Sequence, residues 1–249
     1  MAILIFIIGT IIGSFLLVVG TRLPIGEDIV FSRSKCDHCQ KTLKWYNLIP
    51  IISFIVQKGK CSFCHKKISK EYLLVELLTG LLYLIVYLYF KDGYYFYGSL
   101  VIVSLLIVTF VSDFKYMIIL DSSLVTTILL FIILKFIYQP STIIYSIISG
   151  ILLFLVMLLV SILGKILFKK DSLGGGDIKL AFVIGFILGI KLGLVAIILS
   201  SFLALPYALG QVYLENNHQF PYGPFLIGAL LIVFMFSLKF TNLLNYLFI

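Results

Sequence analysis

Charged residues are scarce in this chain of 249 residues. They make up 12% of it, whereas 61% of the residues are hydrophobic and the mean hydropathy is +1.16. A soluble domain of this size does not need so much apolar surface, so the composition excludes an ordinary soluble globular protein. Repeated apolar runs of about 17 or more residues are long enough to cross a hydrocarbon core roughly 30 Å thick. The composition therefore predicts an all-α fold, a polytopic membrane helical bundle.

The sequence also lacks the marks of a cleaved leader and of a repeat protein. Its opening stretch, "MAILIFIIGTIIGSFLLVVGTRLP", has neither the basic n-region nor the small-residue cleavage site of a secretory signal. We therefore expect this stretch to remain as the first membrane span. No internal repeat is evident along the chain.

About eight membrane spans can be placed. The expected spans are 2–20, 72–90, 96–113, 118–138, 142–167, 178–190, 192–213 and 222–245. The sixth and seventh are the least distinct pair, because only Lys191 and nearby glycines separate them. This placement predicts a first transmembrane helix over 1–21, a polar loop domain over 22–71, and a membrane-embedded core of about seven helices over 72–249.

Basic residues predict the orientation of the spans. The 22–71 segment holds ten of the nineteen Lys and Arg residues, and eight spans place most of the others on its side of the membrane. The positive-inside rule then puts 22–71 in the cytoplasm and both termini outside. The net charge of +8 thus reflects topology rather than binding to nucleic acid. Contact between the basic loop and membrane lipid would be a generic effect.

All four cysteines lie in the polar loop. They form the motifs "CDHC" and "CSFC", with Cys36, Cys39, Cys61 and Cys64 as the four thiols. Two CxxC knuckles separated by 21 residues are close to the spacing of a zinc ribbon. A segment of about 50 residues has too small a core to fold well alone, so a metal has a clear structural purpose. The loop is therefore predicted to be a small, cytoplasmic, zinc-ribbon-like insert with structural zinc.

Other interpretations of the cysteines remain open. The pairs could be redox-active or carry free thiols, although a cytoplasmic location argues against disulfides. His38 and His65 lie beside the knuckles and could replace a sulfur ligand. A closed site with four sulfur ligands has no open position, so no catalytic role is expected for it.

Two carboxylates stand out near the ends of spans. Asp113 lies at the cytoplasmic end of the third span, and Asp177 opens the sixth span at the same side. Ionisable groups near membrane depth are costly and suggest function. Two acids that meet in a low-dielectric site share a proton, so one can activate water while the other donates to a peptide carbonyl. That is the chemistry of an aspartic protease.

Asp121 competes with Asp113 for this role. On a continuous helix the two lie about 12 Å apart, so they cannot form a pair with each other. A pair of Asp121 with Asp177 is possible, but Asp121 is also a good N-cap for the following helix. Asp113 is favoured, in part because of the resemblance described below.

Three consecutive glycines precede Asp177. Gly174, Gly175 and Gly176 permit backbone conformations closed to other residues and let a substrate strand approach the acid. They are the predicted substrate-binding residues. The simpler interpretation is a flexible loop in which Asp177 is a helix N-cap.

Five motifs, in order along nearly the whole chain, resemble one family. They are "GSFLLVVGTRLP" (13–24), the cysteine loop with "WYNLIPIISF" and "VELLTG" (36–80), "SDFKYMIILD" (112–121), "GGGDIKL" (174–180) and "PYGPFL" (221–226). The chain resembles the type IV prepilin peptidases, also called leader peptidase/N-methyltransferases, of the GxGD membrane aspartic proteases. "GGGD" alone is weak, whereas five ordered motifs are highly specific.

The resemblance implies a bacterial enzyme of the cytoplasmic (inner) membrane. Its expected substrates are type IV prepilins or pseudopilins of pilus, competence or type II secretion systems, cleaved at the cytoplasmic face. The expected catalytic residues are Asp113 and Asp177. The resemblance also implies N-methylation of the new terminus with S-adenosylmethionine as methyl donor. No glycine-rich nucleotide loop on a strand supports this independently.

By analogy with the family, the cysteine loop is the expected place for methylation. Arg22, Glu27, Glu71 and Glu76 are its candidate residues. Two non-enzymatic functions remain open, a zinc-ribbon membrane adaptor and a proton-coupled transporter. A transporter would place its acids near the midplane of the membrane, and an adaptor would not need an acid pair.

Overall fold

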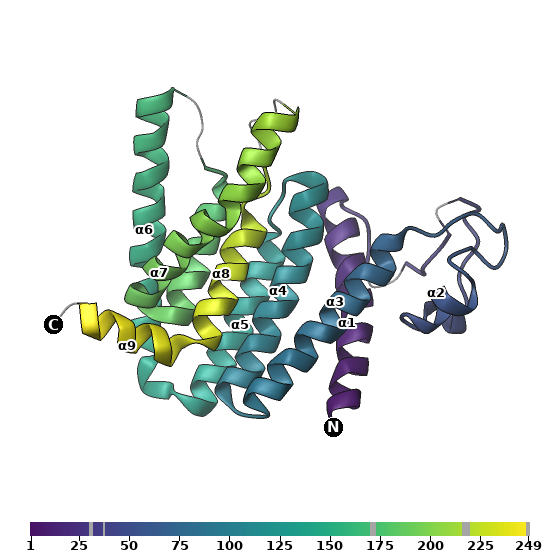
Figure 1. Ribbon diagram of the computed structural model, residues 1–249, viewed down its shortest axis with the longest axis horizontal. Coiled ribbons are helices and arrows are strands. Elements are labelled where there is room, and N and C mark those ends of the chain that lie inside the picture. Colours follow the sequence, from purple (N-terminus) through teal and green to yellow (C-terminus); the bar gives the residue numbers. More distant parts are fainter. Residues whose placement is uncertain (30–31, 37, 170–172, 216–219, 248–249) are drawn as a thin grey trace. The chain divides into compact units, whose positions relative to one another are not determined.

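Helices make up nearly all of the regular structure in the computed structural model, which describes every residue except 30–31, 37, 170–172, 216–219 and 248–249. In the described part there is no strand, only two isolated β-bridges. The predicted all-α fold is therefore confirmed. The chain forms two compact units, Met1–Lys91 and Asp92–Ile249 (Figure 1).

The first unit consists of two long helices and the loop between them. The long helices are α1 (Ala2–Arg22) and α3 (Lys70–Phe90), and the loop carries η1 (Leu23–Ile25), η2 (Trp45–Leu48) and the short α2 (Ile52–Val56). Small residues let the long helices touch, as is common between membrane helices. A Cβ on Gly13 would lie 2.6 Å from Thr79 Oγ1, and one on Gly9 would lie 2.9 Å from Gly80 Cα.

The second unit is a bundle built around one buried helix. Its elements are α4 (Tyr94–Tyr116), α5 (Asp121–Tyr138), η3 (Pro140–Thr142), α6 (Ile143–Phe168), α7 (Gly175–Glu215), α8 (Gly223–Met235) and α9 (Ser237–Leu247). Helix α8 is buried along most of its length and packs against both α4 and α7 (Figure 1). Residues at the start of α8 can therefore contact both neighbours.

Helix α7 is broken at Gly189, whose φ of 78° and ψ of 174° are not helical. In a straight helix, residues 185 and 193 would be about 12 Å apart. Here a Cβ on Gly193 would lie only 3.7 Å from Gly185 Cα, so the chain turns back on itself between them. The two parts of α7 correspond to the predicted spans 178–190 and 192–213.

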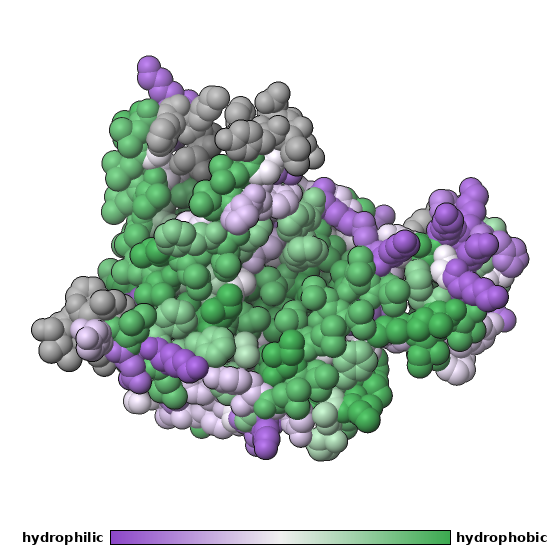
Figure 2. All heavy atoms as spheres, viewed as in Figure 1, coloured by the Kyte–Doolittle hydropathy of each residue, from purple (hydrophilic) through white to green (hydrophobic). Residues whose placement is uncertain are grey.

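The protein is a multi-pass membrane protein. By length and composition, six helices of the described residues can cross a membrane, or seven if the bent pair α8–α9 is one span. If the two parts of α7 on either side of Gly189 are counted separately, the total rises by one, to the predicted count of about eight. Apolar side chains cover much of the molecular face in Figure 2, as expected for helices that contact lipid.

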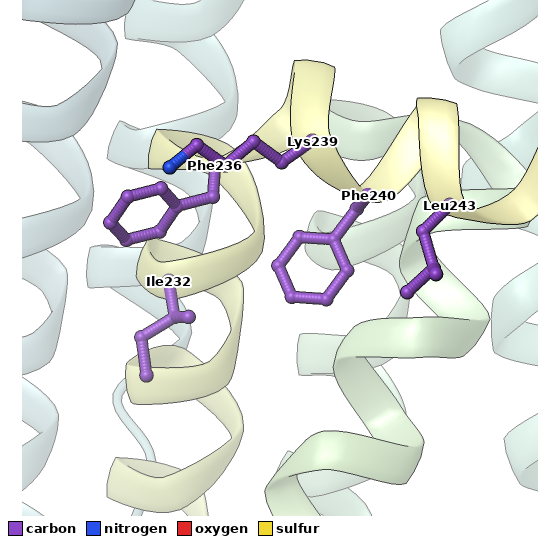
Figure 3. A pocket seen from close by; sticks show the side chains of 5 residues that line it. All are labelled: Ile232, Phe236, Lys239, Phe240 and Leu243. Atoms are coloured by element: carbon purple, nitrogen blue, oxygen red, sulfur yellow. The ribbon is translucent and has the colours of Figure 1, made fainter.

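The predicted span 222–245 is not straight. Helices α8 and α9 are bent by 82° at the break between Met235 and Ser237. The elbow holds a shallow, mostly apolar hollow of about 230 Å³. Its lining side chains, shown in Figure 3, are Ile232, Phe236, Lys239, Phe240 and Leu243.

Candidate functional site

Asp113 lies in the last turn of α4, and its side chain is buried with 6% exposure. Its Oδ2 accepts a hydrogen bond of 3.1 Å from the backbone N–H of Gly223, the first residue of α8. A Cβ at position 223 would lie 3.0 Å from this oxygen and 2.9 Å from Ile119 Cδ1. Only glycine therefore allows the start of α8 to approach the carboxyl this closely.

Asp177 lies in the first turn of α7 and is also buried, with 9% exposure. Its backbone N–H donates to the carbonyl of Gly174 at 3.1 Å. Its Oδ1 is buried without a hydrogen-bond partner among the described residues. Such an atom is costly unless it is protonated or paired. The carboxyl is thus available to a proton or to a bound molecule.

The structure brings these two acids to the same end of the second unit. Ile119 links their surroundings, because a Cβ on Gly176 would lie 2.9 Å from Ile119 Cβ, and Ile119 also approaches Gly223. Ile119 therefore lies between the backbone that precedes Asp177 and the backbone that donates to Asp113. Two neighbouring buried carboxyls can hold one proton between them and activate a water molecule.

The three glycines before Asp177 have different environments. Gly174 and Gly175 are exposed, and a Cβ on Gly175 would meet nothing within 4 Å. Gly176 packs tightly on Ile119. None of the three has a positive φ, so a left-handed backbone is not the reason for glycine at these positions. Gly176 allows close packing on Ile119, and Gly175 leaves open space. An exposed backbone therefore leads directly to a buried acid.

Asp121 occupies a different environment from Asp113. Both of its carboxylate oxygens lie 2.8 Å from Lys179 Nζ, and both side chains of this ion pair are exposed. Asp121 is the first residue of α5, whereas Leu120 occupies the N-cap position, so the N-cap interpretation was wrong. An exposed carboxylate with a lysine partner is less suited to sharing a proton than a buried one.

Sequence reasoning missed two polar features of this site. The first is the ion pair of Lys179 with Asp121, which no pattern in the sequence predicts. The second is Thr109, one turn before Asp113, whose buried Oγ1 has no hydrogen-bond partner among the described residues. The spacing of four residues on one helix would have placed Thr109 beside Asp113.

The four cysteines of the first unit come together as a second candidate site. Each offers a sulfur, and all four sulfurs lie within 4.8 Å of one another. Cys36 Sγ and Cys64 Sγ are 3.8 Å apart. Tetrahedral zinc with bonds of about 2.3 Å places its sulfurs about 3.8 Å apart, so the cluster fits zinc. His38 and His65 are exposed and are not part of this group.

The two CxxC motifs fold alike. In each, the residue before the first cysteine forms a β-bridge with the residue three positions after the second, Lys35 with Thr42 and Lys60 with Lys67. Gln40 and His65, which follow the second cysteines, both have a left-handed φ. In the second knuckle, backbone N–H groups of Cys64 and Phe63 lower the pKa of Cys61 to about 7. This favours the thiolate form at Cys61, whereas burial and the neighbouring thiols raise the pKa of Cys64 to about 11.

The candidate methylation residues lie around the loop of the first unit. Arg22 donates to Ser32 Oγ at 2.7 Å and lies 3.9 Å from Glu27. The backbone N–H of Glu71 donates to Ser69, which caps α3. Glu76 is buried and accepts a hydrogen bond of 2.8 Å from the backbone N–H of Ile51.

Two family models match this chain, one after the other along the sequence. Residues 7–90 match the family described as "Bacterial Peptidase A24 N-terminal domain", and residues 100–209 match the "Type IV leader peptidase family". No solved structure matches the chain.

Curated relatives match over almost the whole length. A "Prepilin leader peptidase/N-methyltransferase" of Bacillus subtilis (strain 168) is 32% identical over 237 residues, which is 94% of each chain. The protein of the same name from Vibrio cholerae is 33% identical over 95% of this chain and 97% of its own. A "Type 4 prepilin-like proteins leader peptide-processing enzyme" of Escherichia coli is 30% identical over 92% of each. The chain belongs to the type IV leader peptidase family and is a peptidase.

Proposed function

We propose that this protein is an aspartic endopeptidase that removes the leader peptide from type IV prepilins or pilin-like proteins. The observation that carries this proposal is the burial of Asp113 and Asp177 at one end of the same helical unit, where Ile119 lies against the backbone next to each acid. The names of the relatives support the substrate class. Competence and type II secretion pseudopilins belong to the same proposed class.

The two acids would divide the work of hydrolysis. One carboxylate takes a proton from water as the water oxygen attacks the scissile carbonyl carbon, while the other carboxyl gives its proton to the carbonyl oxygen. The tetrahedral intermediate then collapses, the C–N bond breaks, and the amine leaves with a proton. The exposed backbone at Gly174 and Gly175, with the packed Gly176, is the proposed place for an extended substrate strand.

Co-expression with a prepilin-like substrate tests the catalytic pair. Asp113→Asn and Asp177→Asn should each abolish shortening of the substrate. Asp92→Asn is a matched control, because Asp92 lies in a turn, where its Oδ1 accepts from the N–H of Gly93. Normal shortening by either of the first two variants would refute the acid pair.

We further propose that the protein methylates the new N-terminus, as the second part of its relatives' name suggests. S-adenosylmethionine would supply the methyl group to the amine that cleavage exposes. Arg22, Glu27, Glu71 and Glu76 stay the candidate residues. Mass spectrometry of the processed pilin should show one added methyl group, and a persistently unmodified amine would limit the protein to peptidase activity.

The 22–71 loop is proposed to lie in the cytoplasm of the bacterial cell, with the cysteine cluster holding structural zinc. Its surplus of basic residues supports this orientation. A membrane-impermeant amine reagent should fail to label the loop lysines in intact cells and should label them after lysis. Labelling of the loop in intact cells would reverse the proposed orientation.

A further inference from the structure

Large apolar side chains are exposed on one short part of the loop, residues 45–56, which contains η2 and α2. The most exposed are Trp45 (76%), Ile52 (60%), Ile55 (65%) and Val56 (75%). The rest of the loop is strongly polar, with ten basic and four acidic residues in 22–71. In Figure 2 the apolar surface gathers over α2, while hydrophilic side chains cover most of the loop around it. Such a segregated patch marks a contact surface.

The position of α2 within the first unit indicates which environment surrounds the apolar surface of residues 45–56. The backbone N–H of Ile51 donates to the Glu76 carboxylate at 2.8 Å. Glu76 lies six residues inside α3, or about 9 Å along its axis from Lys70. The chain before α2 therefore folds back beside a membrane-spanning helix instead of extending beyond its end. In Figure 1, α2 accordingly lies below the start of α3.

The backbone at Ile51, where the chain folds back, is strained, and the hydrogen bond to Glu76 holds it in this conformation. Ile51 has a φ of 61°, a region that β-branched residues rarely adopt. The Glu76 carboxylate that receives its N–H is itself buried in α3. This contact with α3 thus fixes the point from which α2 begins.

We propose that residues 45–56 insert into the leaflet on the loop's side of the membrane, with Glu76 as the positioning residue that holds them there. At the depth of the first turns of α3, an apolar face meets the boundary between headgroups and acyl chains. Trp and Tyr favour that boundary, and Trp45 and Tyr46 open the segment. Lys44 and Lys58 flank its two ends, where they can contact anionic headgroups. The occupant of this surface is therefore lipid.

Trp45 is the only tryptophan of the chain, so its fluorescence reports on this segment alone. The full-length protein is reconstituted, at high dilution, into phosphatidylglycerol-containing vesicles with bromine on the acyl chains near the headgroup. These lipids should quench most of the Trp45 fluorescence, and lipids brominated near the chain ends should quench less of it. Acrylamide in the water should quench it only weakly. If brominated lipid does not quench Trp45 and acrylamide does, the segment lies in water and the proposal is overturned. Emission shielded from both would indicate a protein contact, such as a second copy, and would overturn it equally.

Two pairs of variants test the parts separately. Glu76→Ala removes the acceptor for Ile51 and should expose Trp45 to acrylamide, whereas Glu76→Gln keeps an acceptor oxygen and should not. Unchanged quenching in Glu76→Ala would refute the positioning role. Ile55→Asp, which alters one exposed side chain, should reduce quenching by brominated lipid, whereas Ile25→Asp, at an exposed position of η1 outside this segment, should leave the Trp45 signal unchanged. An Ile55→Asp protein quenched like the wild type would refute insertion of α2.

Discussion

The backbone N–H of Gly223 donates a hydrogen bond of 3.1 Å to Asp113 Oδ2, although 110 residues separate the two in the sequence. The bond joins the end of α4 to the beginning of α8. It fixes the orientation of a buried carboxyl through a backbone group, which has no side-chain freedom of its own. A change at position 223 should therefore act on the acid without altering any ionisable residue.

Gly223→Ala should reduce prepilin cleavage by about 10²-fold, the loss typical of a catalytic group displaced by about 1 Å. The added methyl would lie 2.9–3.0 Å from Asp113 Oδ2, Thr109 Cγ2 and Ile119 Cδ1. Initial cleavage rates of purified enzyme in vesicles measure the effect. Gly228→Ala, on the same helix with nothing within 4 Å, is the control and should keep wild-type activity. Equal rates for the two variants would show that the Gly223 contact does not position the acid.

Asp121→Asn should leave cleavage nearly intact and lower the free energy of unfolding by at most about 1 kcal/mol. The reason is that its ion pair with Lys179 is exposed on both sides, and exposed pairs contribute little. Lys179→Met should behave in the same way. The cleavage rates of these two variants are compared with the cleavage rate of Asp113→Asn. Loss of cleavage in Asp121→Asn, together with normal cleavage in Asp113→Asn, would transfer the first catalytic position to Asp121.

The sequence was a good guide to the membrane helices, because a span is a local property of about 20 apolar residues. It did not show that α8 and α9 bend by 82°, although polar residues interrupt the predicted span 222–245 from Ser237 onward. It also did not distinguish α2 from the polar loop around it. A helix of five residues has no periodicity to detect, and its fold-back depends on the distant Glu76.

For the candidate site, the sequence supplied the residues but not their partners. Asp113 and Asp177 were selected because a carboxylate near membrane depth is unusual. The approach of Gly223 to Asp113 depends on how α8 packs against α4, which no local pattern encodes. The cysteines differ, because a CxxC spacing directly constrains where two sulfurs can meet.

Purified protein should contain about one zinc ion per chain, and Cys36→Ser with Cys39→Ser should lose it, because two ligands of a tetrahedral site are gone. His38→Ala and His65→Ala are the matched controls. Both side chains are exposed and outside the sulfur cluster, so both variants should retain the metal. Elemental analysis after dialysis against a weak chelator gives the content. Zinc retention in the double cysteine variant, or its loss in either histidine variant, would contradict a site made of four sulfurs.

Gly185→Ala should lower the free energy of unfolding by about 1–3 kcal/mol, the usual range for overpacking. A methyl group there would lie 2.5 Å from the carbonyl oxygen of Ser149 and 2.9 Å from Gly150 Cα, so α6 and α7 would have to separate. Gly210→Ala is the control in the same helix. Nothing lies within 4 Å of its added carbon, and alanine favours helix by about 1 kcal/mol over glycine, so stability should hold or rise. Denaturation in mixed detergent, followed by circular dichroism, compares the two. If Gly185→Ala is as stable as Gly210→Ala, the two helices are not in backbone contact at Gly185.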